Sequence, residues 1–140
     1  MLITEIKTAI YKFLFTDASA FKSALTGGLY YVQHPEKSPK NITYPYAIYQ
    51  FVAGTYDRDS GSLFAKPVIQ IDIFDNQSSA DRVSDLGEKL DALLHDSEAS
   101  VSMTNYFVLS IERVSPPREI LTYMARWHHS RDYLIYLQKK

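Results

Sequence analysis

Residues 67–95 read PVIQIDIFDNQSSADRVSDLGEKLDALLH, and they predict a strand, a short polar turn and a helix. In the strand, Ile69, Ile71 and Ile73 alternate with polar residues, which is the period-two pattern of a half-buried β-strand. In the helix, apolar residues recur three and four positions apart and therefore share one face. They are Val83, Leu86, Gly87, Leu90 and Leu94. Two apolar surfaces joined by a tight turn predict that this helix packs on this strand.

Similar patterns continue on both sides of this stretch. Ser79 is the expected N-cap of the helix, since serine accepts hydrogen bonds from the first free backbone amides. Gly27 and Gly28 are expected to end the N-terminal helical region. The other expected elements are a helix over 2–14, a short helical turn reaching residue 25, and strands over 29–32, 46–53, 106–114 and 123–137, with a turn or bulge at 115–119. In the strand at 106–114, alternation predicts that Phe107, Leu109 and Ile111 share one face.

This order of elements predicts an α+β domain. Two helices should pack on one face of a mostly antiparallel β-sheet with about four main strands. A chain of 140 residues suits one domain with a single core, so we expect residues 1–140 to fold as one unit. The hydrophobic content of 46% argues against disorder.

Composition excludes several classes of protein. The formal net charge of -1 argues against a dedicated nucleic-acid-binding protein, whose affinity would depend on a basic face. The chain has no cysteine, so it has no disulfide framework and no thiolate nucleophile or metal ligand. No apolar run approaches the roughly 20 residues of a membrane span, and no signal-peptide pattern is present. A soluble protein without a membrane partner or a cofactor is therefore expected.

The connection between the strands at 46–53 and 68–74 is long. The flanking strands should form an antiparallel pair, and hairpin loops usually have about two to five residues. Residues 54–66 exceed this length, and long loops in compact domains are often functional. The loop carries apolar candidates for contact with another protein and a charged rim. The apolar residues are Tyr56, Leu63 and Phe64, and the charged ones are Asp57, Arg58 and Asp59.

The spacing of the candidate catalytic and metal-binding residues does not fit the geometry that these sites require. His128 and His129 are adjacent on a predicted strand, so their side chains point to opposite faces and cannot share an ion. His128 and Asp132 share a face but are roughly 13 Å apart at about 3.3 Å per residue, too far for ligands about 2 Å from one zinc. Asp59-Ser60-Gly61 resembles the core of an aspartic-protease motif, but it has no second copy and fits a polar hairpin tip. No catalytic or metal-binding residue is predicted, and the protein is not expected to be an enzyme.

Four arginines occur in the C-terminal third of the chain, together with aromatic residues. One interpretation is a nucleic-acid-binding face, in which bases stack on the rings. The preferred interpretation is that the arginines pair with Glu112, Glu119 and Asp132 and lie over aromatic rings. Some positive charge would remain to line a passage or face a partner. These arginines are Arg113, Arg118, Arg126 and Arg131.

Several local phrases resemble one known family. The helix-to-strand junction LTGGLYY at 25–31, the segment ITYPYAIY at 42–49 and the strand VIQIDIF at 68–74 carry the resemblance, together with the helix after that strand. The final strand, with Arg126 and RDYLIY at 131–136, completes it. The chain resembles the tail terminator, or tail completion, proteins of long-tailed bacteriophages over nearly its whole length.

The resemblance implies a structural protein of the virion, found at the head–tail junction and assembled in the host cytoplasm. Subunits of that family form a ring, usually a hexamer, that caps the tail tube, ends its polymerisation and presents a docking face to the head connector. DNA passes through the lumen without sequence-specific binding, and no residue is catalytic. On this basis the hairpin residues at 56–59 and 63–64 are candidate subunit contacts, and the four arginines are candidates to face the lumen or a partner.

Three alternatives remain open. A head-completion or neck protein of the phage connector would have a similar fold and equally little chemistry. A small ligand-binding or enzymatic α+β domain would use His34, His95 or His128 and would respond to zinc or chelators. A module for single-stranded nucleic acid would show binding that weakens steeply with salt.

Overall fold

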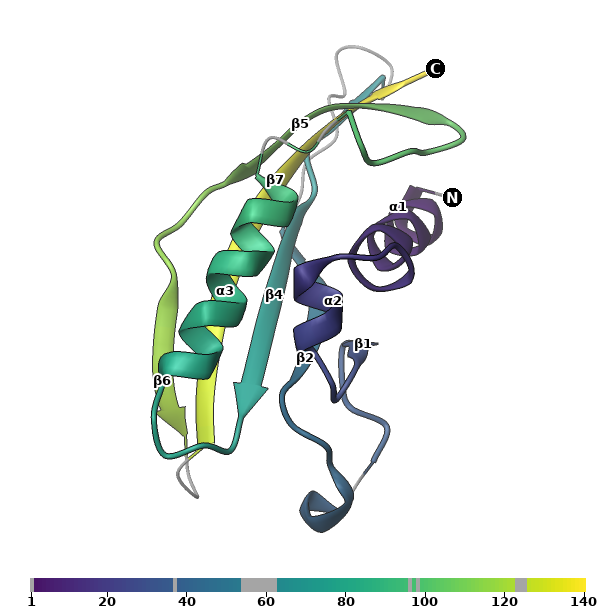
Figure 1. Ribbon diagram of the computed structural model, residues 1–140. Coiled ribbons are helices and arrows are strands. Elements are labelled where there is room, and N and C mark those ends of the chain that lie inside the picture. The colour runs from purple at the N-terminus through teal and green to yellow at the C-terminus, as the bar shows by residue number, and fades with distance from the viewer. Residues whose placement is uncertain (1, 37, 54–62, 96, 98, 123–125) are drawn as a thin grey trace.

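The computed structural model describes residues 2–36, 38–53, 63–95, 97, 99–122 and 126–140 (Figure 1). Within them the chain forms three α-helices, one π-helical turn (Lys12–Thr16), one 3-10 turn (Pro39–Asn41) and one seven-stranded sheet. The helices are α1 (Leu2–Tyr11), α2 (Ala20–Ala24) and α3 (Asp81–Leu94). The strands are β1 (Leu29–Tyr31), β2 (Tyr46–Ala53), β3 (Phe64–Ala65), β4 (Val68–Asp75), β5 (Tyr106–Arg113), β6 (Arg118–Thr122) and β7 (Arg126–Lys139).

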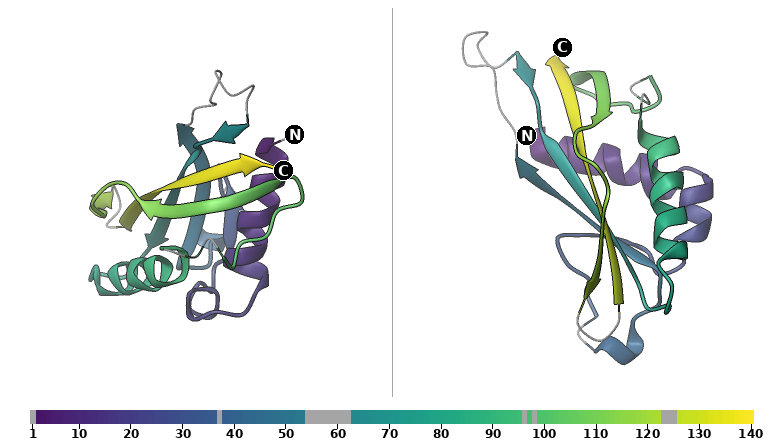
Figure 2. Two further views of the ribbon diagram at one scale, coloured as in Figure 1. Left: turned by 90° about the horizontal axis from the view of Figure 1, so that it is seen from above. Right: turned by 90° about the vertical axis from the view of Figure 1, so that its left-hand side faces the viewer.

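The predicted α+β architecture is confirmed. The three α-helices lie on one face of the sheet, and the other face carries no helix among the described residues (Figure 2). The predicted hairpin between β2 and β4 is present, with Tyr49 opposite Ile71 in an antiparallel register. All strand pairs are antiparallel except β1 with β2. None of the described helices is long and apolar enough to cross a bilayer.

The long strand β7 organises the sheet. β3 and β4 pair along one side of it, interrupted at Lys66-Pro67, while β5 and β6 pair along the other side. Residues 114–117, which include Pro116 and Pro117, separate β5 from β6. Proline cannot donate to a strand ladder, which explains both interruptions. The sheet therefore ends at β1 on one side and at the β5–β6 line on the other.

The core lies between the helices and the odd-numbered residues of the central strands. Ile71 of β4 is buried beneath α3, as the sequence pattern predicts, and Tyr133 of β7 lies in the same layer. The helix contributes its predicted apolar stripe, and α1 contributes Ile6 and Ile10. The other buried apolar residues of β4 and β7 are Ile69, Ile73, Ile135 and Leu137.

Gly27 and Gly28 end the N-terminal helical region as expected. Gly28 has a φ of 96°, which a residue with a side chain rarely adopts. Gly27 is needed for a different reason, because a Cβ there would lie 2.0 Å from the carbonyl oxygen of Thr43. The two glycines therefore let the chain leave α2 and lie against the segment before β2.

Some sequence predictions need correction. The turn or bulge expected at 115–119 ends earlier, because residues 118–122 form β6. The final strand is described from Arg126 onward, and its expected start at 123 lies outside the described residues. Ala80 is the N-cap residue of α3, although the Ser79 hydroxyl still accepts a 3.2 Å hydrogen bond from the amide of Asp81. Four strands have eight or more residues, as expected; the short strands β3 and β6 were not predicted.

The expected face of β5 is also wrong. Alternation placed Phe107, Leu109 and Ile111 on one face, but the register shifts at a bulge between Val108 and Ser110. An extra residue in one strand reverses which face the following side chains take. Ile111 is consequently 0% exposed in the core, whereas Phe107 is 53% exposed on the other face.

Candidate functional site

The face of the sheet away from the helices carries a polar network that joins three strands. His128 Nε2 of β7 lies 2.8 Å from Asp72 Oδ1 of β4. Gln70 donates to both Asp72, at 3.0 Å, and the Ser130 hydroxyl, at 3.1 Å. Arg118 of β6 donates to Ser130 at 2.9 Å. These bonds tie β4, β7 and β6 together on a face that no described helix covers.

The cluster of Asp72, His128 and Ser130 contains the residue types of a serine hydrolase, but not its geometry. A nucleophilic serine must share its proton with the histidine. The hydroxyl of Ser130 is instead bonded to Gln70 and Arg118, and the residue is buried. The cluster is therefore a structural network of the sheet.

Aromatic rings extend this surface toward β1. Phe74 stacks on His128 with ring centroids 4.5 Å apart, and Tyr46 stacks on Phe74 at 5.0 Å. His34 then packs between Tyr46 and Tyr30, at 4.8 and 4.4 Å. Such pairs add about 0.5–1.5 kcal/mol each beyond area burial. The row therefore packs tyrosine, phenylalanine and histidine rings across this part of the sheet.

The histidines do not converge. His128 and His129 point to opposite faces, as strand alternation predicted, because His128 pairs with Asp72 whereas His129 lies beneath α3 against Gly87. His34 Nδ1 accepts a bond from the Glu36 amide, and His95 is exposed at the end of α3. No group of three or more His, Asp or Glu side chains in the described part of the chain is arranged to hold a metal ion.

Arg113, Arg118 and Arg131 have carboxylate partners, which differ in part from the predicted ones. Arg118 pairs with Asp132 at 3.2 Å, as expected. Arg113 and Arg131 both pair with Asp91 of α3, at 3.4 Å, instead of with Glu112 or Glu119. Arg131 is only 5% exposed and lies on the helix side of β7. In the isolated subunit it supports the fold and offers no surface to a partner.

Arg126 lies at the start of β7. Its guanidinium is 5.5 Å from the centre of the Tyr44 ring. This agrees with the prediction that these arginines lie over aromatic rings. Together with Arg118, which is exposed at the start of β6, it remains a candidate to face a partner.

Of the six candidate contact residues in the hairpin, the structure describes two, Leu63 and Phe64. Tyr56, Asp57, Arg58 and Asp59 lie outside the described residues, so their proposed contacts stay predictions. Leu63 is exposed, and its carbonyl accepts a 2.7 Å bond from the Lys139 amide. Phe64 is half-buried and stacks on Tyr136 of its own sheet, 5.7 Å away. Of the two, Leu63 is the side chain available to another molecule.

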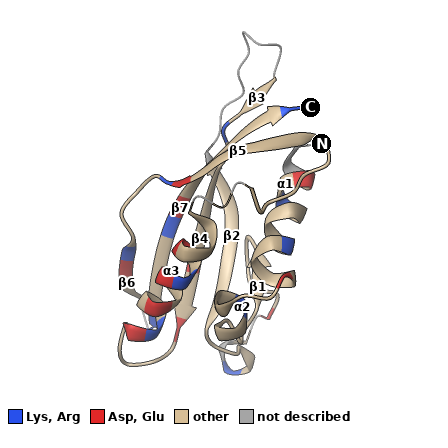
Figure 3. Cartoon of the chain, turned by 45° about the horizontal axis from the view of Figure 1, so that its top comes forward, with Lys and Arg blue, Asp and Glu red and all other residues tan. Residues whose placement is uncertain are grey.

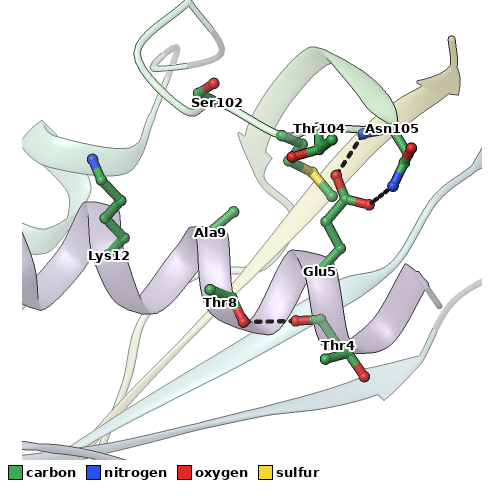
Figure 4. A pocket seen from close by; sticks show the side chains of 9 residues that line it. Thr4, Glu5, Thr8, Ala9, Lys12, Ser102, Thr104 and Asn105 are labelled. Carbon is green, nitrogen blue, oxygen red and sulfur yellow. Dashed lines mark hydrogen bonds between the residues drawn. The ribbon is translucent and has the colours of Figure 1, made fainter.

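A groove of about 420 Å³ separates α1 from residues 102–105 (Figure 4). Glu5 spans it and accepts hydrogen bonds from the amide of Asn105, at 2.7 Å, and from its side chain, at 2.9 Å. Burial tends to raise the pKa of Glu5, but these bonds outweigh it and lower the pKa. The carboxylate is thus already used to hold α1 against this segment.

The pKa values of Asp72 and His129 are also shifted. Burial tends to raise the pKa of Asp72, but hydrogen bonds led by that of His128 outweigh it and leave the pKa below its usual value. Burial, followed by the charge of Arg131, lowers the pKa of His129. Arg131 Nε donates to His129 Nε2 at 2.8 Å, which requires a neutral ring with the proton on Nδ1, facing Glu119 at 3.3 Å.

The stability of the protein is expected to fall on mild acidification. The unfolded chain binds a proton at His129 near pH 6.5, whereas the folded chain does so only at lower pH. The unfolded state therefore binds more protons in this window, and the free energy of unfolding decreases as pH falls below about 6.5. Urea melts from pH 7.5 downward, paired with NMR titration of the histidines, test this. A His129 pKa above 6.5 in the folded protein would contradict it.

Comparison with known proteins identifies the fold. The sequence matches no protein-family model and no curated protein. Among the solved chains that match is one from a structure described as "Virion of native gene transfer agent (GTA) particle", with a TM-score of 0.74 and 9% identity. The match covers 97% of this chain and 96% of that chain. The two chains share a fold. At this identity the likeness concerns architecture alone and assigns no role to any residue.

Proposed function

We propose that this protein is a structural subunit of a phage-like virion, and specifically the tail terminator that caps the tail tube. The observation that carries the proposal is the length of the fold match. Nearly all of this chain and nearly all of a chain from a gene transfer agent virion have the same architecture.

The surfaces of the subunit are consistent with assembly. The polar cluster of the open face is occupied by its own hydrogen bonds, and the groove beside α1 is held by Glu5. In the part of the chain that the structure describes, the two edges of the sheet remain available, and exposed strand edges suit contacts with other proteins. This agrees with the tail terminator resemblance, whose members act through assembly.

In this proposal, copies of the chain form a ring, a hexamer by resemblance, on the last ring of the tail tube. One side of the ring stops tube polymerisation and the other receives the head connector, while DNA passes through the lumen. The hairpin at 54–66 contacts a neighbouring subunit through residues 56–59 and through Leu63, with Phe64 supporting it from the sheet. Arg118 and Arg126 are proposed to face the lumen or a partner.

Tube length tests this function directly. Tube protein of the same particle is polymerised with increasing amounts of this protein, and tube lengths are measured by electron microscopy. A terminator is expected to shorten the tubes in proportion to its dose. Leu63→Glu, at an exposed position, is expected to need at least a tenfold higher dose, whereas the control Gln77→Glu, exposed in the turn between β4 and α3, should match the wild type. Unchanged tube lengths with the wild type would overturn the proposal.

The same assay separates the neck alternative. A head-completion or neck protein would leave tube length unchanged and would co-sediment with connector particles. That combination would replace the terminator proposal and keep the virion role.

A further inference from the structure

Exposed apolar side chains gather along one edge of the sheet. The described residues include nine exposed large hydrophobic side chains, and five of them lie on or between β5 and β6. They are Phe107, Leu109, Val114, Ile120 and Leu121. Scattered exposed hydrophobics are ordinary, but a cluster on one edge indicates an interaction surface.

This edge has the side-chain pattern of an inner strand. Leu121 lies opposite Trp127 and faces the helix side, whereas Ile120 lies opposite His128 and faces the open side. Apolar residues on both faces are typical of strands covered on both sides. No described strand pairs with the outer side of β5 or β6, and natural proteins usually shield such edges. The pattern is that of a sheet continued by another strand.

The opposite edge of the sheet is formed by β1 and also exposes an apolar side chain. There β1 is followed by Val32, which is 52% exposed and has a φ of 69°. A β-branched residue rarely adopts this conformation, and such strain is concentrated at functional positions. The helix α1 lies on the same side of the sheet (Figure 1), and its Tyr11 is exposed. Both edges of the sheet thus expose apolar side chains. At one edge they lie on or between β5 and β6, and at the other Val32 directly follows β1.

The two flanks also differ in charge (Figure 3). The first, here called the β6 flank, consists of α3, β5 and β6. It carries six acidic residues and four basic ones: Asp81, Asp85, Glu88, Asp91, Glu112 and Glu119 against Arg82, Lys89, Arg113 and Arg118. The second, called the β1 flank, consists of residues 2–24, β1 and Val32. It carries Lys7, Lys12 and Lys22 against Glu5 and Asp17. One flank is net negative and the other net positive, which favours their association.

We propose that the β6 flank of one copy binds the β1 flank of the next copy. The β5–β6 edge then lies beside β1, and the sheet continues from subunit to subunit. Such a contact joins two different surfaces, so it is head-to-tail and closes into a ring when the rotation allows. The inference rests on the proposed function, which requires a ring, and adds the surfaces that form it.

The absence of cysteine from the chain permits a direct test by cross-linking. Leu121→Cys and Val32→Cys are made separately and together, since both positions are exposed. Each variant is treated with a short bis-maleimide, alone and on tail tubes, after its thermal unfolding has been matched to the wild type. The control is Gln77→Cys, exposed in the turn between β4 and α3 and on neither flank.

The expected result is a dimer band only when the two single variants are mixed, and a ladder of multimers from the double variant. Mixing Gln77→Cys with either variant should give no band. Self-cross-linking of Leu121→Cys alone would show a two-fold contact and overturn the inference, as would no cross-link in solution and on tubes. If tubes are shortened but these flanks do not cross-link, the function stands and the inference falls. If the ladder forms but tubes are unaffected, the inference stands and the function falls.

Discussion

Asp91→Ala is expected to lower the free energy of unfolding by about 3 kcal/mol. Asp91 accepts a 3.0 Å hydrogen bond from the Tyr133 hydroxyl and lies 3.4 Å from Arg131. Both partners are buried, and burial together with the Asp91 carboxylate raises the pKa of Tyr133, which therefore stays protonated and donates. Removing the carboxylate leaves a buried guanidinium without its counter-charge.

The matched control is Asp85→Ala on the same helix. Asp85 is 58% exposed and pairs with Lys89, whereas Asp91 is 27% exposed. An exposed pair contributes less than about 1 kcal/mol, so this variant should melt close to the wild type. Urea unfolding of both variants gives the difference. Equal losses would show that Asp91 acts only as a surface charge.

Gly87→Ala is expected to destabilise the protein by about 2 kcal/mol, although alanine is the better helix former. The exchange gains about 1 kcal/mol of helix propensity. A Cβ at this position, however, would lie 2.3 Å from His129 Nε2. Arg131 and Glu119 hold that ring, so it cannot move aside without losing hydrogen bonds. Overpacking of this kind costs typically 1–3 kcal/mol, and the broken bonds add to it.

A double-mutant cycle isolates this contact. His129→Ser removes the ring, and Gly87→Ala in that background should lose most of its penalty, because only the propensity gain remains. The coupling between the two sites is the measured quantity. Additive effects would contradict the close approach of α3 to β7. Ala92, exposed on the same helix, provides a control: Ala92→Gly should cost about 1 kcal/mol in either background.

The sequence was sufficient for the parts of the fold that depend on local patterns. The period-two run in β4 and the apolar stripe of α3 predicted that these two elements pack, because each buries one face. Strand alternation likewise predicted that His128 and His129 diverge. The short strands β3 and β6 escaped prediction since two and five residues carry little periodicity. The bulge in β5 escaped it because register depends on β7, far along the chain.

The sequence could not predict the pairing of charged residues either, because the partners lie far apart along the chain. Arg131 was expected to pair with a carboxylate on its own or a neighbouring strand, yet its partner is Asp91 on α3. Gly87 looked like one more member of an apolar stripe, and its need for a missing Cβ becomes visible only with His129 in place. The apolar residues of β6 could have suggested an edge strand, but Pro116 and Pro117 before them indicated a turn.

The most direct measurement of the central claim is cryo-electron microscopy of tail tubes incubated with this protein. The account predicts a ring of density at one end of each tube, into which copies of this subunit fit side by side around a central channel. Tubes with bare ends, or protein bound along their length, would contradict the proposed terminator.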